Sequence, residues 1–229
     1  MEQREQNPGA TDGKFYSLND MVKAGCGDCE GCSACCRGMG SSIIVNPLDS
    51  FLITENLGKT FEELLAGYYE LGVENGLILP HLKMREKDDA CIFLTQEGRC
   101  SIHGFRPGIC RIFPLGRSYG KDGIQYIFLT NGCRKKNRTK VKVQKWIDTP
   151  DIRENERFLI NWHFFCTNLQ KKTEQGRDAE SAKAASMYVL KKFYMESYEG
   201  QNDFYSQFQE RLNQAQKDLG ISSGNLEEI

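Results

Sequence analysis

Eleven residues near the start of the chain decide how the protein is held together: Cys26-Gly-Asp-Cys29-Glu-Gly-Cys32-Ser-Ala-Cys35-Cys36. The cysteines of this stretch recur every third residue and end in an adjacent pair. A C-x2-C step lets two thiolates bind one ion from a tight turn. Glycine is unfavourable inside a helix, and this stretch and its flanks are rich in it. The sequence therefore predicts a metal-binding loop here.

The chain has 229 residues and ten cysteines, nine of which lie between Cys26 and Cys133. Residues 1–14 lack the apolar segment of a secretion signal, and no apolar run is long enough to span a membrane. We therefore expect a cytoplasmic protein, in which thiols stay reduced. Clustered cysteines in such a compartment indicate metal ligands, and the alternatives are a disulfide framework or buried thiols.

The overall composition excludes some partners and leaves others open. Apolar residues make up 39% and charged residues 27%, as in soluble globular proteins. The net charge of -1 argues against a strong general affinity for polyanions. The basic run from Arg134 to Lys145 is expected to be a solvated face that Val143 and Trp146 anchor to the core. Nucleic acid and membrane are therefore not expected partners, and an unidentified protein partner stays possible.

The patterns along the chain predict an α+β fold with a loop- and hairpin-rich cysteine head and a mainly helical C-terminal half. We expect a flexible N-terminal arm at residues 1–24, a metal-binding region at 25–150, a helical region at 151–220 packed on it, and a disordered tail at 221–229. The expected helices span 46–55, 60–69, 151–169, 179–196 and 203–220. We also expect a hairpin at 91–103, a turn or single helical turn at 106–114, and a strand at 124–129.

The spacing of the cysteines leaves the type of metal open. Cys26, Cys29, Cys32 and Cys36 reproduce the C-x2-C-x2-C-x3-C run of bacterial ferredoxins, except that Arg37 stands where that run has proline. No histidine pair follows at zinc-finger spacing, so a Cys2His2 finger is not expected. His103 and Cys166 are not expected to be ligands. A histidine at a turn usually forms a hydrogen bond, and a cysteine on an apolar helix face is usually a buried thiol.

Four motifs follow one another in order: Cys29-x2-Cys32-x2-Cys35-Cys36, Cys91-x-Phe93-Leu94, Cys100-Ser-Ile and Arg106-Pro107-x2-Cys110-Arg111-x-Phe113-Pro114. This order resembles the YkgJ-type CxxCxxCC cysteine-cluster family, which is described as a zinc- or iron-chelating domain. Cys133 and the segment from Val143 to Trp146 also fit the resemblance. The part of the chain from residue 151 onward lies outside it.

The resemblance implies that eight cysteines bind metal: Cys29, Cys32, Cys35, Cys36, Cys91, Cys100, Cys110 and Cys133. Eight thiolates suffice for two four-cysteine sites, which would hold zinc ions or iron–sulfur clusters. Cys35 and Cys36 are adjacent, so we expect them to serve different sites, or one of them to support a site without binding the metal itself. Arg106 and Arg111 are expected to offset thiolate charge or to bind an anion. Some relatives are flagellin lysine N-methylases, so a methyl-transferring enzyme and a zinc-stapled interaction module are the alternative functions.

Overall fold

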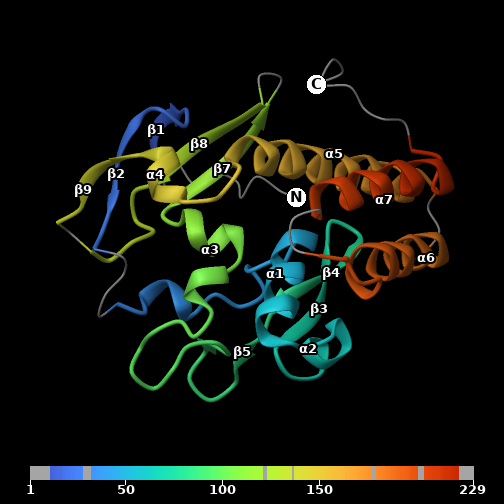
Figure 1. Cartoon of the computed structure of the whole chain (residues 1–229), viewed down its shortest axis with the longest axis horizontal. Helices are drawn as coiled ribbons and strands as arrows, with labels where there is room; N and C mark the ends of the chain where they lie inside the picture. The colour runs from blue at the N-terminus through green and yellow to red at the C-terminus, as the bar shows by residue number, and fades with distance from the viewer. Residues whose placement is uncertain are drawn as a thin grey trace.

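The computed structural model describes residues 11–27, 32–120, 123–135, 137–176, 179–200 and 204–221. Small antiparallel sheets occupy the N-terminal part and long helices the C-terminal part, which confirms the expected α+β class (Figure 1). Within the described residues, no helix combines the length and the apolar character needed to cross a lipid bilayer. Residues 1–10 of the expected arm and 222–229 of the expected tail lie outside this description.

Three strands form the largest sheet, in which β8 (Gly123–Leu129) lies between β1 (Thr11–Tyr16) and β7 (Leu115–Gly120). A second antiparallel pair joins β2 (Met21–Gly25) to β9 (Thr139–Lys142). Within residues 11–24, which we expected to belong to a flexible arm, 11–16 and 21–24 therefore form strands. Val22 and Ala24 of β2 are buried in the smaller of the two cores. They are two residues apart, so they lie on the same face of the strand and give it an apolar side.

Two short helices begin with the capping signals that the sequence contains. In α1 (Pro47–Leu57), the Asn46 side chain accepts a hydrogen bond from the Asp49 N–H, and the Asp49 carboxylate accepts one from the Asn46 N–H. Thr60 and Glu63 form the same reciprocal pair at the start of α2 (Phe61–Gly67). Such pairs satisfy N–H groups that the first turn of a helix leaves without partners. After α2 the chain forms β3 (Tyr69–Glu74) and β4 (Leu77–Leu82), which pair with each other.

The segment predicted as a hairpin at 91–103 has a different structure. Two short strands, β5 (Met84–Arg85) and β6 (Ala90–Cys91), pair before it, and Leu94 and Cys100 form only an isolated bridge. Phe93 and Leu94 are consecutive and both buried, at 4% and 3% exposure. The Ser101 N–H donates to the Phe93 carbonyl at 2.9 Å and the Thr95 N–H to the Arg99 carbonyl at 2.8 Å, so the segment folds back on itself without forming two regular strands. The chain forms a compact loop instead, which ends in the one-turn helix η2 (His103–Phe105).

The single helical turn expected at 106–114 is confirmed as α3 (Gly108–Ile112). Further along, α4 (Val143–Ile147) follows β9 and anchors the basic run as expected. Val143 and Ile147 are buried, and the Trp146 ring N–H donates to the Ile112 carbonyl at 3.0 Å. The C-terminal helices are α5 (Ile152–Gly176), α6 (Ala179–Leu190), the π-helix η3 (Lys191–Met195) and α7 (Phe204–Asp218), and α5 is longer than predicted.

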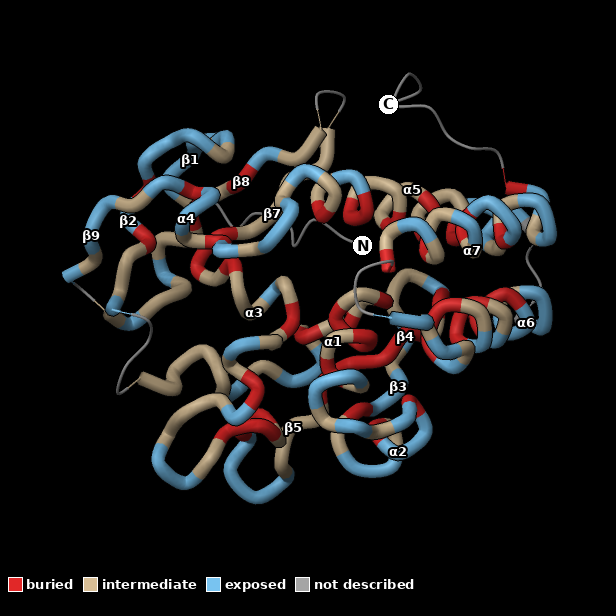
Figure 2. Tube along the Cα trace, in the orientation of Figure 1, coloured by how far each residue is buried: buried red, intermediate tan, exposed pale blue. Residues whose placement is uncertain are grey.

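The main core joins the helical half to the α1–β6 region. Phe158 and Trp162 of α5 contact Phe208 of α7, with ring centroids 4.6 and 6.2 Å apart. Buried positions of α5 and α7 face one another, whereas their outer faces are exposed (Figure 2). The stripe of Phe158, Trp162 and Phe165 is thus a packing face, as predicted. A smaller core gathers residues of β2, β7, β8 and α4.

The imidazole ring of His163 in α5 is half-buried, so its protonation affects the free energy of unfolding. Its ring stacks on that of Tyr119 of β7, with the centroids 4.0 Å apart. Within the described residues its Nδ1 is buried without a hydrogen-bond partner. Burial lowers the pKa of His163 to about 4.

We expect this histidine to make the protein less stable in mild acid. Between pH 6.5 and pH 4 the unfolded chain binds a proton that the folded His163 does not, so stability falls as the pH falls through this window. With allowance for solvent at the half-buried ring, wild type should lose about 1–2 kcal/mol more than His163→Phe between pH 7 and pH 5. Urea unfolding of both proteins at both pH values measures this difference. Equal losses in the two proteins would contradict it.

Candidate metal centre

The adjacent Cys35 and Cys36 lie on the one-turn helix η1 (Ala34–Cys36). The Cys36 N–H donates to the Ser33 carbonyl at 3.0 Å, which closes the turn. The two thiols hydrogen-bond to each other, and this bond together with burial raises the pKa of Cys35. Arg37 then bridges to Ala90 in antiparallel register. This register brings Cys36 beside Cys91, because neighbours of a bridged pair face each other across the two chains.

Four cysteines, which we name the inner group, pack in or against the main core: Cys36, Cys91, Cys100 and Cys110. They come from η1, β6, the 91–103 loop and α3, so four chain segments meet here. Burial raises the pKa of the Cys110 thiol well above its usual value, and the nearby Cys91 and Cys100 thiols raise it further. The sulfurs are therefore close enough for one charged thiolate to disfavour the next. A bound cation reverses this repulsion.

Two thiols of the inner group accept hydrogen bonds from the backbone. The Phe93 N–H donates to the Cys91 sulfur, and the Ile102 N–H donates to the Cys100 sulfur. Burial raises the pKa of both thiols, and these donors lower it again in part. In each case the donor is two residues after the cysteine. N–H donors of this kind stabilise thiolates and orient them for metal binding.

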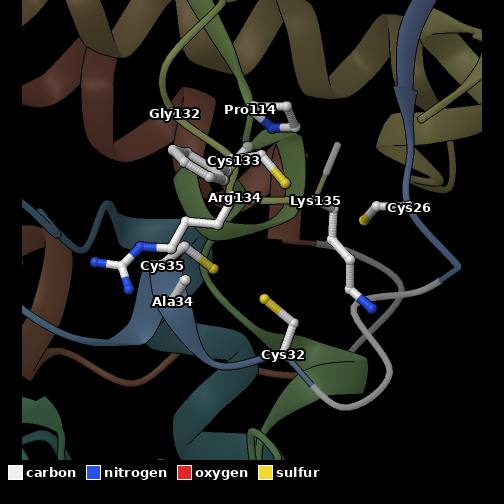
Figure 3. A pocket seen from close by; sticks show the side chains of 10 residues that line it. Cys26, Cys32, Ala34, Cys35, Pro114, Gly132, Cys133, Arg134 and Lys135 are labelled. Atoms are coloured by element: carbon white, nitrogen blue, oxygen red, sulfur yellow. The ribbon is translucent and has the colours of Figure 1, made fainter. Parts of the chain in front are cut away.

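Four cysteines, which we name the outer group, line a pocket at the surface: Cys26, Cys32, Cys35 and Cys133. Figure 3 shows their sulfurs directed towards the space that they surround. That space measures about 20 Å³, which suits a single water-sized sphere. Cys35 lies at the boundary of the two groups, since its thiol also raises the pKa values of Cys91, Cys100 and Cys110.

Arginine and lysine side chains surround both groups of thiols. Arg106 acts electrostatically on Cys35 and Cys100, and Arg85 acts on Cys91, in each case favouring the thiolate. Lys135 and Arg134 line the outer pocket. Four thiolates around a divalent ion leave a net negative charge, so these cations stabilise a loaded site.

Arg111, in contrast, has a role that the sequence did not predict. Its guanidinium donates to the Gly104 carbonyl at 2.7 Å and to the Asp148 carbonyl at 3.2 Å. It therefore fastens α3 to the segments on either side of it. We expected Arg111 to offset thiolate charge or to bind an anion, and the contacts that the structure adds are those with these two backbone carbonyls.

Asp49 is a further residue of the site that sequence reasoning missed. It is buried, and besides its capping bond to Asn46 it accepts the Gly108 N–H at 2.8 Å. Burial raises the pKa of Asp49 to about 6, and these hydrogen bonds and Arg117 oppose that rise. Asp49 thus joins the start of α1 to the start of α3, the helix that carries Cys110. Its position in a capping box was visible in the sequence, but nothing there indicated the contact with a residue so far along the chain.

The remaining candidate residues are one buried cysteine, two histidines and one cysteine that the structure does not describe. Cys166 is buried in the core, as predicted. The His103 Nε2 contacts the Arg106 guanidinium, and the His81 Nδ1 contacts the Ser41 carbonyl oxygen. Cys29 lies outside the described residues. None of the described cysteines forms a disulfide.

The donor chemistry of the site fits a thiophilic metal. Eight of the nine described cysteines belong to the two groups, and thiolates prefer zinc or iron to magnesium or calcium. As the side chains stand, no three His, Cys, Asp or Glu residues in the described parts of the chain could hold an ion. Metal binding therefore requires the sulfurs to lose their protons and draw closer together.

The comparison with protein families agrees with this chemistry. Residues 28–134 match the model of the CxxCxxCC family, whose description is "putative zinc- or iron-chelating domain". This segment of the chain is therefore similar to the CxxCxxCC domain. The matched segment contains all eight cysteines of the predicted ligand set, and Cys26 and Cys166 lie outside it. The search of curated proteins and the search of solved structures gave no match.

We expect the Asp49 carboxylate to be needed for the placement of α3. In Asp49→Ala the half-buried Gly108 N–H loses its acceptor, so the free energy of unfolding should fall by about 1–3 kcal/mol. Hydrogen exchange at the Gly108 amide should accelerate as well. The control is Asp88→Ala, which removes an exposed carboxylate paired with Arg85 at 2.9 Å and should destabilise the protein much less. An unchanged exchange rate at Gly108 would contradict the assigned role of Asp49.

Proposed function

We propose that this protein chelates zinc or iron in two adjoining cysteine centres. The inner centre consists of the inner group, Cys36, Cys91, Cys100 and Cys110. The outer centre draws on Cys32, Cys35 and Cys133; Cys29, the other ligand that the sequence predicts, lies outside the described residues. The observation that carries the proposal is that distant segments bring all described cysteines except Cys166 into two neighbouring groups.

The division of the adjacent pair between the two centres rests on their surroundings. Cys36 packs against the main core together with the three other thiols of the inner group. Cys35 instead lines the surface pocket. Tetrahedral sites with four cysteines are the usual arrangement for structural zinc, and they leave no position for a substrate. We propose that the buried inner centre is such a site.

The metal is proposed to contribute folding free energy locally. The segments that carry the inner thiols are short: a single turn of η1, a two-residue strand, a compact loop and one turn of α3. Elements of this length are marginal without external support. A thiolate-bound ion supplies cross-links between them, and its binding free energy adds to stability. A reducing compartment such as the cytoplasm keeps the thiols available, so we propose that location.

Four thiolates leave two kinds of occupant open for the outer centre, a zinc or iron ion and an iron–sulfur cluster. The absorption spectrum of protein purified without oxygen separates them, because thiolate-bound iron–sulfur clusters absorb visible light and zinc does not.

Metal analysis of full-length variants tests the proposal. We expect wild type purified without oxygen to contain two equivalents of zinc or iron, and Cys110→Ser and Cys133→Ser each to lose one. The control Cys166→Ser should keep both, since its thiol belongs to the apolar core. Metal content that is the same in Cys110→Ser, Cys133→Ser and wild type would refute the ligand assignment.

Removal of the metal should destabilise the cysteine region more than the helices. After chelation we expect hydrogen exchange to accelerate by at least about tenfold at 91–112, because the ion no longer joins these segments. Exchange in the middle of α5, whose aromatic face is packed against α7, should change little. Equal acceleration in both regions would argue that the metal stabilises the whole fold, and no change in either would argue against a structural metal.

A further inference from the structure

Cys26 lies outside the segment that matches the CxxCxxCC family, yet it faces the outer pocket with Cys32, Cys35 and Cys133 (Figure 3). Three of these four residues belong to the ligand set that the sequence implied. The fourth, Cys26, was suggested only by its ferredoxin-like spacing.

The strand pair β2–β9 fixes where Cys26 lies. Cys26 directly follows β2, and the last residue of that strand, Gly25, is paired with Thr139 at the start of β9. Cys133 and Lys135 belong to the segment that leads into β9. The pairing therefore brings the C-terminal end of β2 close to the segment that precedes β9, and both reach the pocket. Cys26 and Cys133 are neighbours there although more than a hundred residues separate them.

Glycine at position 25 favours this close approach. A Cβ atom on Gly25 would lie 2.4 Å from Thr139 Oγ1 and 3.2 Å from the Thr139 carbonyl oxygen. Rotation of the Thr139 side chain could relieve the first contact, whereas the second is with the backbone, so an added Cβ would push the two strands apart. Cys26 is the next residue and would move with them.

We propose that Cys26 is a metal ligand of the outer centre. This inference rests on the proposed function and extends it to a residue that the family motif does not contain. Its ligand class is a thiophilic divalent cation, zinc or ferrous iron. On binding, the Cys26 S–H bond is replaced by a sulfur–metal bond, and the proton is released to solvent. The Lys135 side chain on the pocket wall offsets the resulting negative charge.

The consequence is that the N-terminal strands take part in holding the metal. Without Cys26, the outer ligands come from the η1 region and the segment around Cys133. With Cys26 as a ligand, the ion also links β2 to these segments. Because β2 pairs with β9, the ion then stabilises the β2–β9 pair as well. Metal binding at the outer centre should therefore protect residues 21–26 from hydrogen exchange.

Differential alkylation of the full-length protein tests the ligand role. Zinc-loaded and chelator-treated samples are labelled with iodoacetamide, and labelling is quantified at each cysteine by peptide mass spectrometry. We expect zinc to slow alkylation of Cys26 at least tenfold, together with that of Cys32 and Cys133. Cys166 should be slow and unaffected by zinc. If Cys26 is labelled equally with and without zinc while Cys32, Cys110 and Cys133 are protected, this inference fails and the proposed function stands. If zinc protects none of them, the proposed function fails as well.

Two variants distinguish coordination from mere proximity. Cys26→Ser should weaken binding of the outer zinc at least tenfold and leave the inner zinc in place. Gly25→Ala keeps the thiol but displaces it, so it should weaken the same site. The matched control is Met21→Ser, an exposed position on the same strand, which should bind both ions as wild type does. Wild-type zinc affinity in Cys26→Ser, with folded protein by circular dichroism, would overturn the inference.

Discussion

The structure depends on the convergence of thiol groups that the chain carries far apart. Cysteines from η1, β6, the 91–103 loop, α3 and the segment before β9 meet in one region, and each of these segments is short. Bringing so many sulfurs together is unfavourable once they ionise, as the raised pKa of the buried Cys110 indicates. Arg85 and Arg106 reduce this cost, and a cation removes it. A bound metal would therefore make the close packing of these thiolates favourable.

The helical half of the protein supplies the stability that the cysteine region lacks. Its aromatic face joins α5 and α7, and the same core extends under α1 and β4. The Tyr194 hydroxyl of η3 donates to the Val45 carbonyl at 2.9 Å, so the C-terminal helices also hold the start of α1 in place. Asp49 at that start then holds α3. A continuous path of buried contacts thus runs from the helices to Cys110 without involving a metal.

Local signals in the sequence predicted the elements that depend on local interactions. The helices that begin after Asn46 and Thr60, the helical turn that carries Cys110, and the aromatic stripe of α5 all depend on neighbours within one or two turns. The errors concern long-range packing. Residues 11–24 form strands because β8 and β9 are there to pair with them, and the 91–103 segment buries two consecutive residues against the core. The roles of Asp49 and Arg111 depend on contacts with distant backbone groups, which leave no pattern in the sequence.

The two cysteine groups differ in their surroundings, and this difference bears on what each could do. The inner thiols lie in or against the apolar core, so exchange of a ligand there requires packed segments to open locally. The outer thiols line a pocket at the surface with Lys135 and Arg134 on its wall. An ion held there is within reach of solvent, of a competing thiol or of a partner protein. Cys35 stands between the two groups and acts electrostatically on the inner thiols. Cys35 lines the outer pocket and its neighbour Cys36 packs with the inner thiols, so a change of charge at Cys35 acts directly on the inner group.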